Sequence, residues 1–404
     1  MLKNESQNIF LVVPKLIEQS TWGGEYILSS KNWSDRNCFR DIRIGQSYEL
    51  FSGSKLRSDI NSSEDRTFTG ELGYAMEPDK IMYEGDSSKL VSLEKISHKD
   101  PKGILGEKVL EIYGEKPGVL IKYTQATGNS FQIHVKEKDS KGKWHFKPEG
   151  FFYLEKGLLT LGTKKNCDWK EYEQLMILLE EKMRQLSERI LRGEIKKEEA
   201  ELFASNLIKE HDPWKFVNVI KTKKNEAVDL SEGGLHHSWE EDSDKYPVGN
   251  VVYEICYDVM DPISVLRCFD KCKFKPDGTL RKLDVKEYFK YVDRSETIND
   301  PTRHIIKPES ILSDNSVTAE SLLRTKYYNL DRLMLEKTEY EGKVTELKGS
   351  YHHLFLRSGR VIIKSTQSEL ELTSGHSCFI PNAVESYKII VPTGKAEILK
   401  TFVS

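Results

Sequence analysis

The sequence lacks a long apolar run and has no excess of either charge. It contains 61 basic and 64 acidic residues, and the two signs are interspersed. We therefore expect no patch for nucleic acid or for a membrane surface. In the first thirty residues the longest apolar run is Ile9 to Val13, which Pro14 ends. Five residues are too few for a signal-peptide core or a membrane span, so we expect a cytoplasmic protein.

Cysteine is also scarce and shows no framework spacing. The six cysteines are scattered over the chain: Cys38, Cys167, Cys256, Cys268, Cys272 and Cys378. Three residues separate Cys268 from Cys272, whereas zinc knuckles and redox pairs have two. We predict reduced, mostly buried thiols. The length of 404 residues suffices for two or three domains with sizeable cores.

The hydrophobic pattern has period two through most of the chain, which indicates β-strands. After Cys167 apolar residues recur every three or four positions from Leu175 to Ile190, and Gly193 stands where a helix cap is expected. A second helical segment, KKEEAELFASNLIKEH, follows and predicts an αα hairpin. Period two resumes at Trp214, so we interpret the hairpin as an insertion into a β-domain. Toward the C-terminus the turn spacing is typical of a sandwich or small barrel.

A candidate metal site lies between Ser130 and Leu161. Gln132 and His134 are two residues apart in an apolar segment, so in a strand both side chains leave the same face. A charged loop follows, and Glu149 opens the next strand, so a hairpin returns it to the same neighbourhood. An amide oxygen, an imidazole nitrogen and a carboxylate suit a borderline ion such as Zn²⁺. The same spacing also fits a polar pair on a solvated sheet face.

A fourth ligand is expected from the pair His236 and His237, which follows two glycines that permit a sharp turn into a strand. Adjacent residues in a strand face opposite ways, so only one of the pair enters the pocket. We favour His237 and leave His236 as the alternative. A second pair, His352 and His353, lacks a Gln-x-His partner, and we interpret it as structural.

Three further side chains are candidates for a substrate pocket. Lys122 lies in the apolar run VLIKY, where it faces either solvent or the interior of a barrel. Glu254 lies in the strand VVYEICY, and Arg267 follows in the next segment. The planar fork of arginine binds a phosphate or an oxyanion bidentately, although pairing with Asp261 or Asp270 at the surface is the commoner arrangement.

Taken in order, the motifs of this chain resemble those of the class I mannose-6-phosphate isomerase family, a zinc-dependent double cupin. The matching segments are WGG (22–24), GQSYEL (45–50), GVLIKY (118–123), FQIHV (131–135), KPEGFFYL (147–154), GGLHHS (233–238), EICYDVMDPISVLRCFD (254–270), DGTLRKL (277–283) and SGHSCFIPNAVESYKI (374–389). The resemblance covers most of the chain. It departs from the family at Val135, Tyr48 and Ser231, and residues 261–267 form a longer segment than the family has.

The resemblance implies a mainly β protein with two cupin (jelly-roll) β-barrels and an inserted helical hairpin. It implies a catalytic cupin in residues 1–166 and 214–312, the second part with a helical segment. The hairpin would occupy residues 167–213 and a C-terminal cupin residues 313–404. The implied zinc ligands, for one Zn²⁺ per chain, are Gln132, His134, Glu149 and His237, and the implied catalytic and substrate-binding residues are Lys122, Glu254 and Arg267.

The implied reaction interconverts mannose 6-phosphate and fructose 6-phosphate through an enediol. In it the metal polarises substrate oxygens and Arg267 stabilises an oxyanion or grips the phosphate. The general base is left open among Glu254, Lys122 and a metal-bound hydroxide. The alternatives are a non-catalytic or regulatory double cupin that binds a sugar or sugar phosphate, and an isomerase of another sugar phosphate. The expected partner is a small sugar phosphate, without nucleic acid or membrane, and the expected state is a monomer or homodimer.

Overall fold

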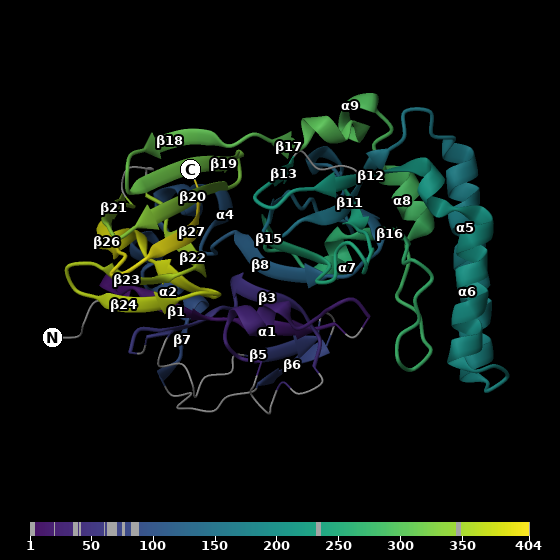
Figure 1. Cartoon of the computed structure of the whole chain (residues 1–404), viewed down its shortest axis with the longest axis horizontal. Helices are drawn as coiled ribbons and strands as arrows, with labels where there is room; N and C mark the ends of the chain where they lie inside the picture. The colour runs from purple at the N-terminus through teal and green to yellow at the C-terminus, as the bar shows by residue number, and fades with distance from the viewer. Residues whose placement is uncertain are drawn as a thin grey trace.

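The structure is a computed structural model, and it describes residues 5–19, 21–34, 39, 42–59, 61–62, 71–74, 77–81, 89–231, 236–344 and 349–403. For residues 71–74, 77–81 and 236–238 it describes the backbone alone. The described chain is mainly β, and its two longest helices lie on one side (Figure 1). This confirms the predicted fold class.

Two large sheets form the body of the molecule (Figure 1). The first contains, in spatial order, β17 (Ile305–Ile306), β13 (Ala227–Leu230), β10 (Glu149–Tyr153), β15 (Asn250–Tyr257), β8 (Val119–Ala126), β3 (Ile44–Leu50), β2 (Lys15–Glu18), β5 (Glu71–Tyr74) and β6 (Glu77–Ile81). The second contains β18 (Glu309–Ser313), β19 (Val317–Arg324), β20 (Asn329–Glu336), β27 (Lys395–Phe402), β22 (His352–Ser358), β25 (His376–Ile380), β1 (Phe10–Val13), β4 (Lys55–Arg57) and β7 (Val91–Ser92). Neighbouring strands are antiparallel except β2 and β5.

Smaller sheets cover each large sheet and close it into a barrel. The first is covered by β12 (Val217–Thr222), β11 (Gly157–Thr163), β14 (His236–Trp239), β16 (Leu266–Phe269) and β9 (Phe131–Ile133). The second is covered by β21 (Glu339–Lys343), β26 (Ser386–Ile390), β23 (Arg360–Lys364) and β24 (Glu369–Thr373). Each large sheet shares an apolar cluster with its cover, for example Phe151 with Leu159 and Leu356 with Ile389.

The second barrel includes strands from both ends of the chain. Phe10 of β1 pairs with Phe379 of β25, and β4 and β7 extend the same sheet. The first hundred residues therefore contribute to both barrels, because β2 and β3 belong to the first large sheet.

The outer faces of the two large sheets pack on each other. Tyr123 of β8 and Tyr253 of β15 contact Phe355 of β22, with ring centroids 5.2 and 5.4 Å apart. Successive residues in a strand point to opposite faces, so their neighbours Lys122 and Glu254 point into the first barrel. The packing of the two barrels thus fixes which side chains reach the barrel interior.

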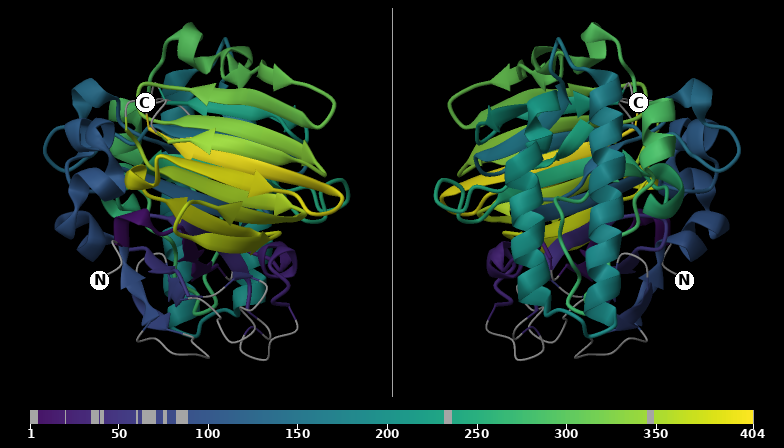
Figure 2. Two further views of the ribbon diagram at one scale, coloured as in Figure 1. Left: turned by 90° about the vertical axis from the view of Figure 1, so that its left-hand side faces the viewer. Right: turned by 90° about the vertical axis from the view of Figure 1, so that its right-hand side faces the viewer.

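The predicted helical hairpin is confirmed as α5 (Trp169–Leu191) and α6 (Lys197–His211), and Gly193 follows α5 with a φ of 72°. Figure 2 shows the two helices side by side along one flank of the molecule. Tyr172 and Met176 of α5 share an apolar cluster with β9, β16 and α8 (Val285–Tyr291). The other helices are α1 (Tyr26–Ser30), α2 (Leu93–Lys99), α3 (Pro101–Leu105), α4 (Glu107–Tyr113), α7 (Asp261–Ser264) and α9 (Glu296–Asn299). Among the described helices, none combines the length and apolarity that a bilayer crossing requires.

His352 and His353 are buried in β22, where they bond tyrosine hydroxyls. Nδ1 of His352 lies 2.9 Å from the Tyr387 hydroxyl, and Nδ1 of His353 lies 3.1 Å from that of Tyr253. These contacts agree with the structural interpretation of the pair. Burial lowers the pKa of His353 from 6.5 to about 3.

We predict that His353 makes the protein less stable in acid. Because its folded pKa is depressed, the unfolded chain binds a proton between pH 6.5 and 3 that the folded chain does not, so stability is lost as pH falls through this window. At pH 4.5 the loss amounts to about 3 kcal/mol. His353→Gln should weaken the pH dependence of the free energy of unfolding by that amount, measured by denaturant titration at pH 7 and 4.5. An unchanged difference between the two pH values would refute this assignment.

Candidate functional site

Two neighbouring rows of side chains on the inner face of the first large sheet carry the candidate site. In one row the strand register aligns Phe151, Glu254, Lys122 and Tyr48 across β10, β15, β8 and β3. In the next row Glu149 pairs with Cys256. The antiparallel register therefore brings residues far apart in sequence, from β3 to β15, onto one surface inside the barrel.

Lys122 and Glu254 form a buried ion pair. Lys122 Nζ donates to Glu254 Oε1 at 2.7 Å, and the Thr124 hydroxyl donates to Glu254 Oε2 at 3.2 Å. The two charged side chains are 5 % and 4 % exposed, so Lys122 faces the barrel interior and not solvent. Burial raises the pKa of Glu254 above 4.5, although Lys122 opposes the shift. Burial disfavours the ammonium of Lys122, but neighbouring acidic groups raise its pKa well above 10.5.

His134 and Glu149 meet in the barrel as the sequence predicted. The Nδ1 of His134 lies 2.5 Å from the carbonyl oxygen of Ser264, which can only accept, so Nδ1 carries the proton and donates. That bond directs Nε2 toward Glu149, whose Oε1 lies 3.1 Å away. Two ligand atoms at zinc–ligand distances of 2.0–2.1 Å in a tetrahedral site lie about 3.3 Å apart. The backbone carbonyl thus sets the tautomer that a metal-binding imidazole needs.

Gln132 lies in β9, where its Cα partner in β16 is Arg267. It lines the same pocket as Glu149 and accepts a hydrogen bond from the Ser130 hydroxyl at 3.2 Å. Three of the four predicted ligands therefore come from converging elements. The backbone of His236 and His237 opens β14, which pairs with β11, but their side chains lie outside the described residues, so the choice of His237 stays a prediction.

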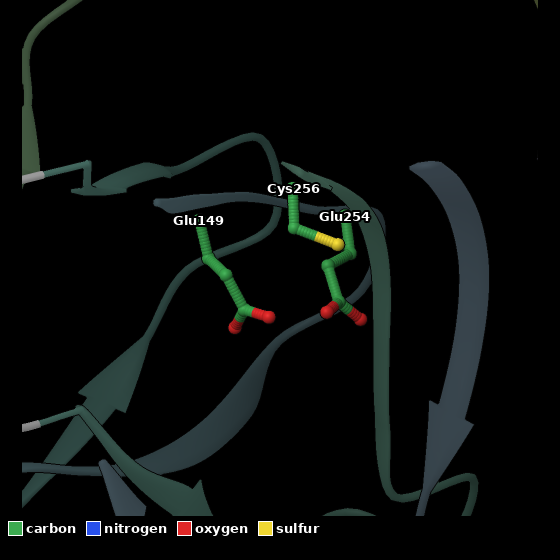
Figure 3. Close-up of side chains that lie close together, drawn as sticks. All are labelled: Glu149, Glu254 and Cys256. Atoms are coloured by element: carbon green, nitrogen blue, oxygen red, sulfur yellow. The ribbon is translucent and has the colours of Figure 1, made fainter. Parts of the chain in front are cut away.

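Cys256, which the sequence motifs did not single out, is a neighbour of this site. Ligand atoms of Glu149, Glu254 and Cys256 all lie within 4.8 Å of one another. Figure 3 shows the two carboxylates turned toward a common space, with the thiol beside Glu254. Burial raises the pKa of the Cys256 thiol, and its Sγ donates to the Leu120 carbonyl oxygen at 3.6 Å. The Cys256 thiol is therefore protonated and lies beside the carboxylates of the site. All described cysteines, including Cys256, are free thiols. Cys38 lies outside the described residues.

Lys147 was also missed, and together with Asp261 it links Glu149 to Arg267. Lys147 Nζ lies 3.3 Å from Glu149 Oε1 and 3.0 Å from Asp261 Oδ1. Arg267 Nη2 lies 3.5 Å from Asp261 Oδ2. Lys147 precedes Glu149 by two residues in the K-P-E motif, so period two already placed it on the face of Glu149. The partner of Arg267 is thus Asp261, one of the two acids that the sequence offered.

The charges of this pocket hold one another in their ionised forms. Partial burial opposes ionisation of Asp261, but Lys147, Lys122 and Arg267 keep its pKa far below the usual range. Burial, together with Arg281, lowers the pKa of Arg267 to about 10, so it stays charged at neutral pH. The pocket is lined by Gln19, Trp22, Gln46, Lys122, Asn129, Gln132, Lys147, Glu149, Phe151, Trp239, Glu254, Asp261, Val265, Arg267 and Arg281.

Comparison with known proteins gives a match at the level of the fold. No family model matches the chain, and neither does any curated protein sequence. Among solved structures, the mannose 6-phosphate isomerase from Bacillus subtilis is 14 % identical, with a TM-score of 0.63 over 98 % of this chain and 99 % of that one. A zinc-bound mannose 6-phosphate isomerase is 15 % identical (TM-score 0.63; 98 % and 100 %). A variant of the phosphomannose isomerase from Salmonella typhimurium is 15 % identical (TM-score 0.64; 98 % and 99 %).

We predict that Lys122→Met destabilises the protein by about 3–5 kcal/mol, because it leaves the Glu254 carboxylate buried without its ion-pair partner. The double variant Lys122→Met/Glu254→Gln should recover most of that loss. Lys170→Met, at an exposed position of α5, is the control and should change stability by less than about 0.5 kcal/mol. Guanidinium unfolding of the native protein, Lys122→Met, Glu254→Gln, the double variant and the control measures the coupling. Additive effects of the two site substitutions would show that the pair has no such role.

Proposed function

We propose that this protein is a metal-dependent aldose–ketose isomerase that interconverts mannose 6-phosphate and fructose 6-phosphate. The observation that carries the proposal is the approach of His134 Nε2 to Glu149 Oε1 inside the first barrel, with the Lys122–Glu254 pair in the adjacent row. The likeness in fold to mannose 6-phosphate isomerases supports it.

The donor set fits Zn²⁺. Gln132, His134 and Glu149 would hold the ion, with His237 as the fourth ligand. When bound, zinc polarises sugar oxygens and stabilises the negative charge that develops on them. Nitrogen and oxygen donors with a fixed imidazole tautomer support this choice.

The protonation states support Glu254 as the general base. Lys122 stays an ammonium because its pKa is raised, so it donates to a substrate oxygen and does not remove a proton. Glu254 is a carboxylate whose raised pKa suits proton transfer between C1 and C2 of the sugar. Arg267 is charged and binds the phosphate or an oxyanion. In this proposal Lys122 is the hydrogen-bond donor and Glu254 is the general base, and the two residues form one ion pair.

We predict that the purified protein forms fructose 6-phosphate from mannose 6-phosphate in a coupled assay. A chelator, or the variant His134→Ala, should reduce kcat/KM by at least about a hundredfold because the metal is lost. His145→Ala is the matched control, since the His145 side chain is exposed, and it should retain activity.

Activity that persists in His134→Ala after chelation would contradict the metal mechanism. Calorimetric binding of mannose 6-phosphate without conversion would instead identify a non-catalytic sugar-phosphate-binding protein. If the protein converts another aldose phosphate in a substrate panel, the assigned site residues stand and only the substrate assignment changes.

A further inference from the structure

The Asp261 carboxylate lies between two buried cations of the pocket. Its Oδ1 faces Lys147 Nζ and its Oδ2 faces Arg267 Nη2, so one carboxylate bridges both cations. The side chains of Lys147 and Arg267 are 1 % and 11 % exposed, whereas that of Asp261 is 35 % exposed. Packing therefore fixes the two cations in place, while the anion between them borders solvent.

Each of the other cations of the pocket already has a carboxylate. Lys122 pairs with Glu254, and Arg281 Nη1 lies 3.4 Å from Asp270 Oδ1. Among the described side chains that line the pocket, four cations face three carboxylates, and Asp270 outside the lining pairs with the fourth cation, Arg281. A phosphate dianion placed beside these carboxylates would be repelled, because charges interact strongly in a poorly solvated site. One carboxylate has to leave before a phosphate can be held, and Asp261 is the most exposed charged group of the lining.

The shape of the pocket gives the same result. Its volume is about 40 Å³, which at roughly 10–15 Å³ per water holds about three waters and not a hexose phosphate. Asp261 opens the four-residue helix α7 and follows Met260, whose side chain is 70 % exposed. A turn of the Asp261 side chain alone would enlarge the pocket and leave the α7 backbone bonded to His134 through the Ser264 carbonyl oxygen.

We propose that Asp261 is a resident anion, which occupies the oxyanion subsite between Lys147 and Arg267 and leaves it when a phosphorylated substrate binds. A phosphate offers arginine and lysine the same charge-assisted contacts as the carboxylate that it replaces. The identity of the substrate rests on the proposed function. The exchange of the Asp261 carboxylate for a phosphate does not depend on it. An incoming anion must displace the Asp261 carboxylate, so the subsite favours doubly charged phosphate over singly charged anions.

The test is binding of inorganic phosphate to the purified, metal-containing protein, measured by isothermal titration calorimetry at low ionic strength. Asp261→Asn should bind phosphate about ten times more tightly than the native protein, since the competing charge is gone. The matched control is Asp244→Asn, which removes an exposed carboxylate that does not line the pocket. It should bind phosphate with native affinity.

Equal or weaker phosphate binding by Asp261→Asn would overturn the proposal, and so would equal tightening in both variants, which is a nonspecific charge effect. Should Asp261→Asn fold poorly, a crystal structure of the native protein with phosphate decides: phosphate on Lys147 and Arg267 with Asp261 turned away supports the proposal, and phosphate elsewhere rejects it. Phosphate binding needs no turnover. If the protein has no isomerase activity but Asp261→Asn binds phosphate more tightly, the proposed function is refuted and the anion subsite is supported. If the protein is an active isomerase but Asp261→Asn does not bind phosphate more tightly, the subsite is refuted and the proposed function stands.

Discussion

Ionisable side chains buried inside a β-barrel have to be neutralised within that barrel. In this protein Lys122, Glu254, Lys147 and Glu149 are each at most 5 % exposed, so removing any one charge leaves another uncompensated. Such a cluster is expensive to desolvate and contributes little to stability by itself. A buried charge cluster of this kind is therefore best explained by a role in catalysis or ligand binding.

The architecture around the cluster restricts how these side chains can move. The outer face of the first sheet is covered by the second barrel, through contacts such as Tyr253 with Phe355. On the other side, α5 and α8 pack behind β9 and β16, the strands that carry Gln132 and Arg267. The helical hairpin thus supports the strands of the site, and none of its described side chains lines the pocket. Asp261, on a short surface helix, is the charged member with the least cover.

Much of this arrangement follows from local sequence patterns. Period two gave the strands, the three-and-four spacing gave the α5–α6 hairpin, and the Gln132-x-His134 spacing gave a shared face. The return of Glu149 after a loop also followed from its position at the start of a strand. These inferences succeed because each depends only on the geometry of one strand, one helix or one hairpin.

Other features depend on pairing between distant strands, which a single sequence does not encode locally. That β1 pairs with β25, and that Glu149 pairs with Cys256, follows from sheet order alone. The alternation of side chains along a strand does not show which of its two faces is buried. The sequence therefore left open whether Lys122 faces solvent or the barrel interior. The bridge that Asp261 makes between Lys147 and Arg267 needs three separate segments to meet.

The central claim is that Gln132, His134, Glu149 and His237 surround a zinc ion and that the nearby Cys256 thiol does not bind it. X-ray absorption spectroscopy of the zinc-loaded protein tests this claim most directly. If these four residues hold the ion, the spectrum shows only nitrogen and oxygen atoms bound to zinc, at about 2.0–2.2 Å. A sulfur ligand at about 2.3 Å would contradict it and place the metal at Glu149, Glu254 and Cys256 instead.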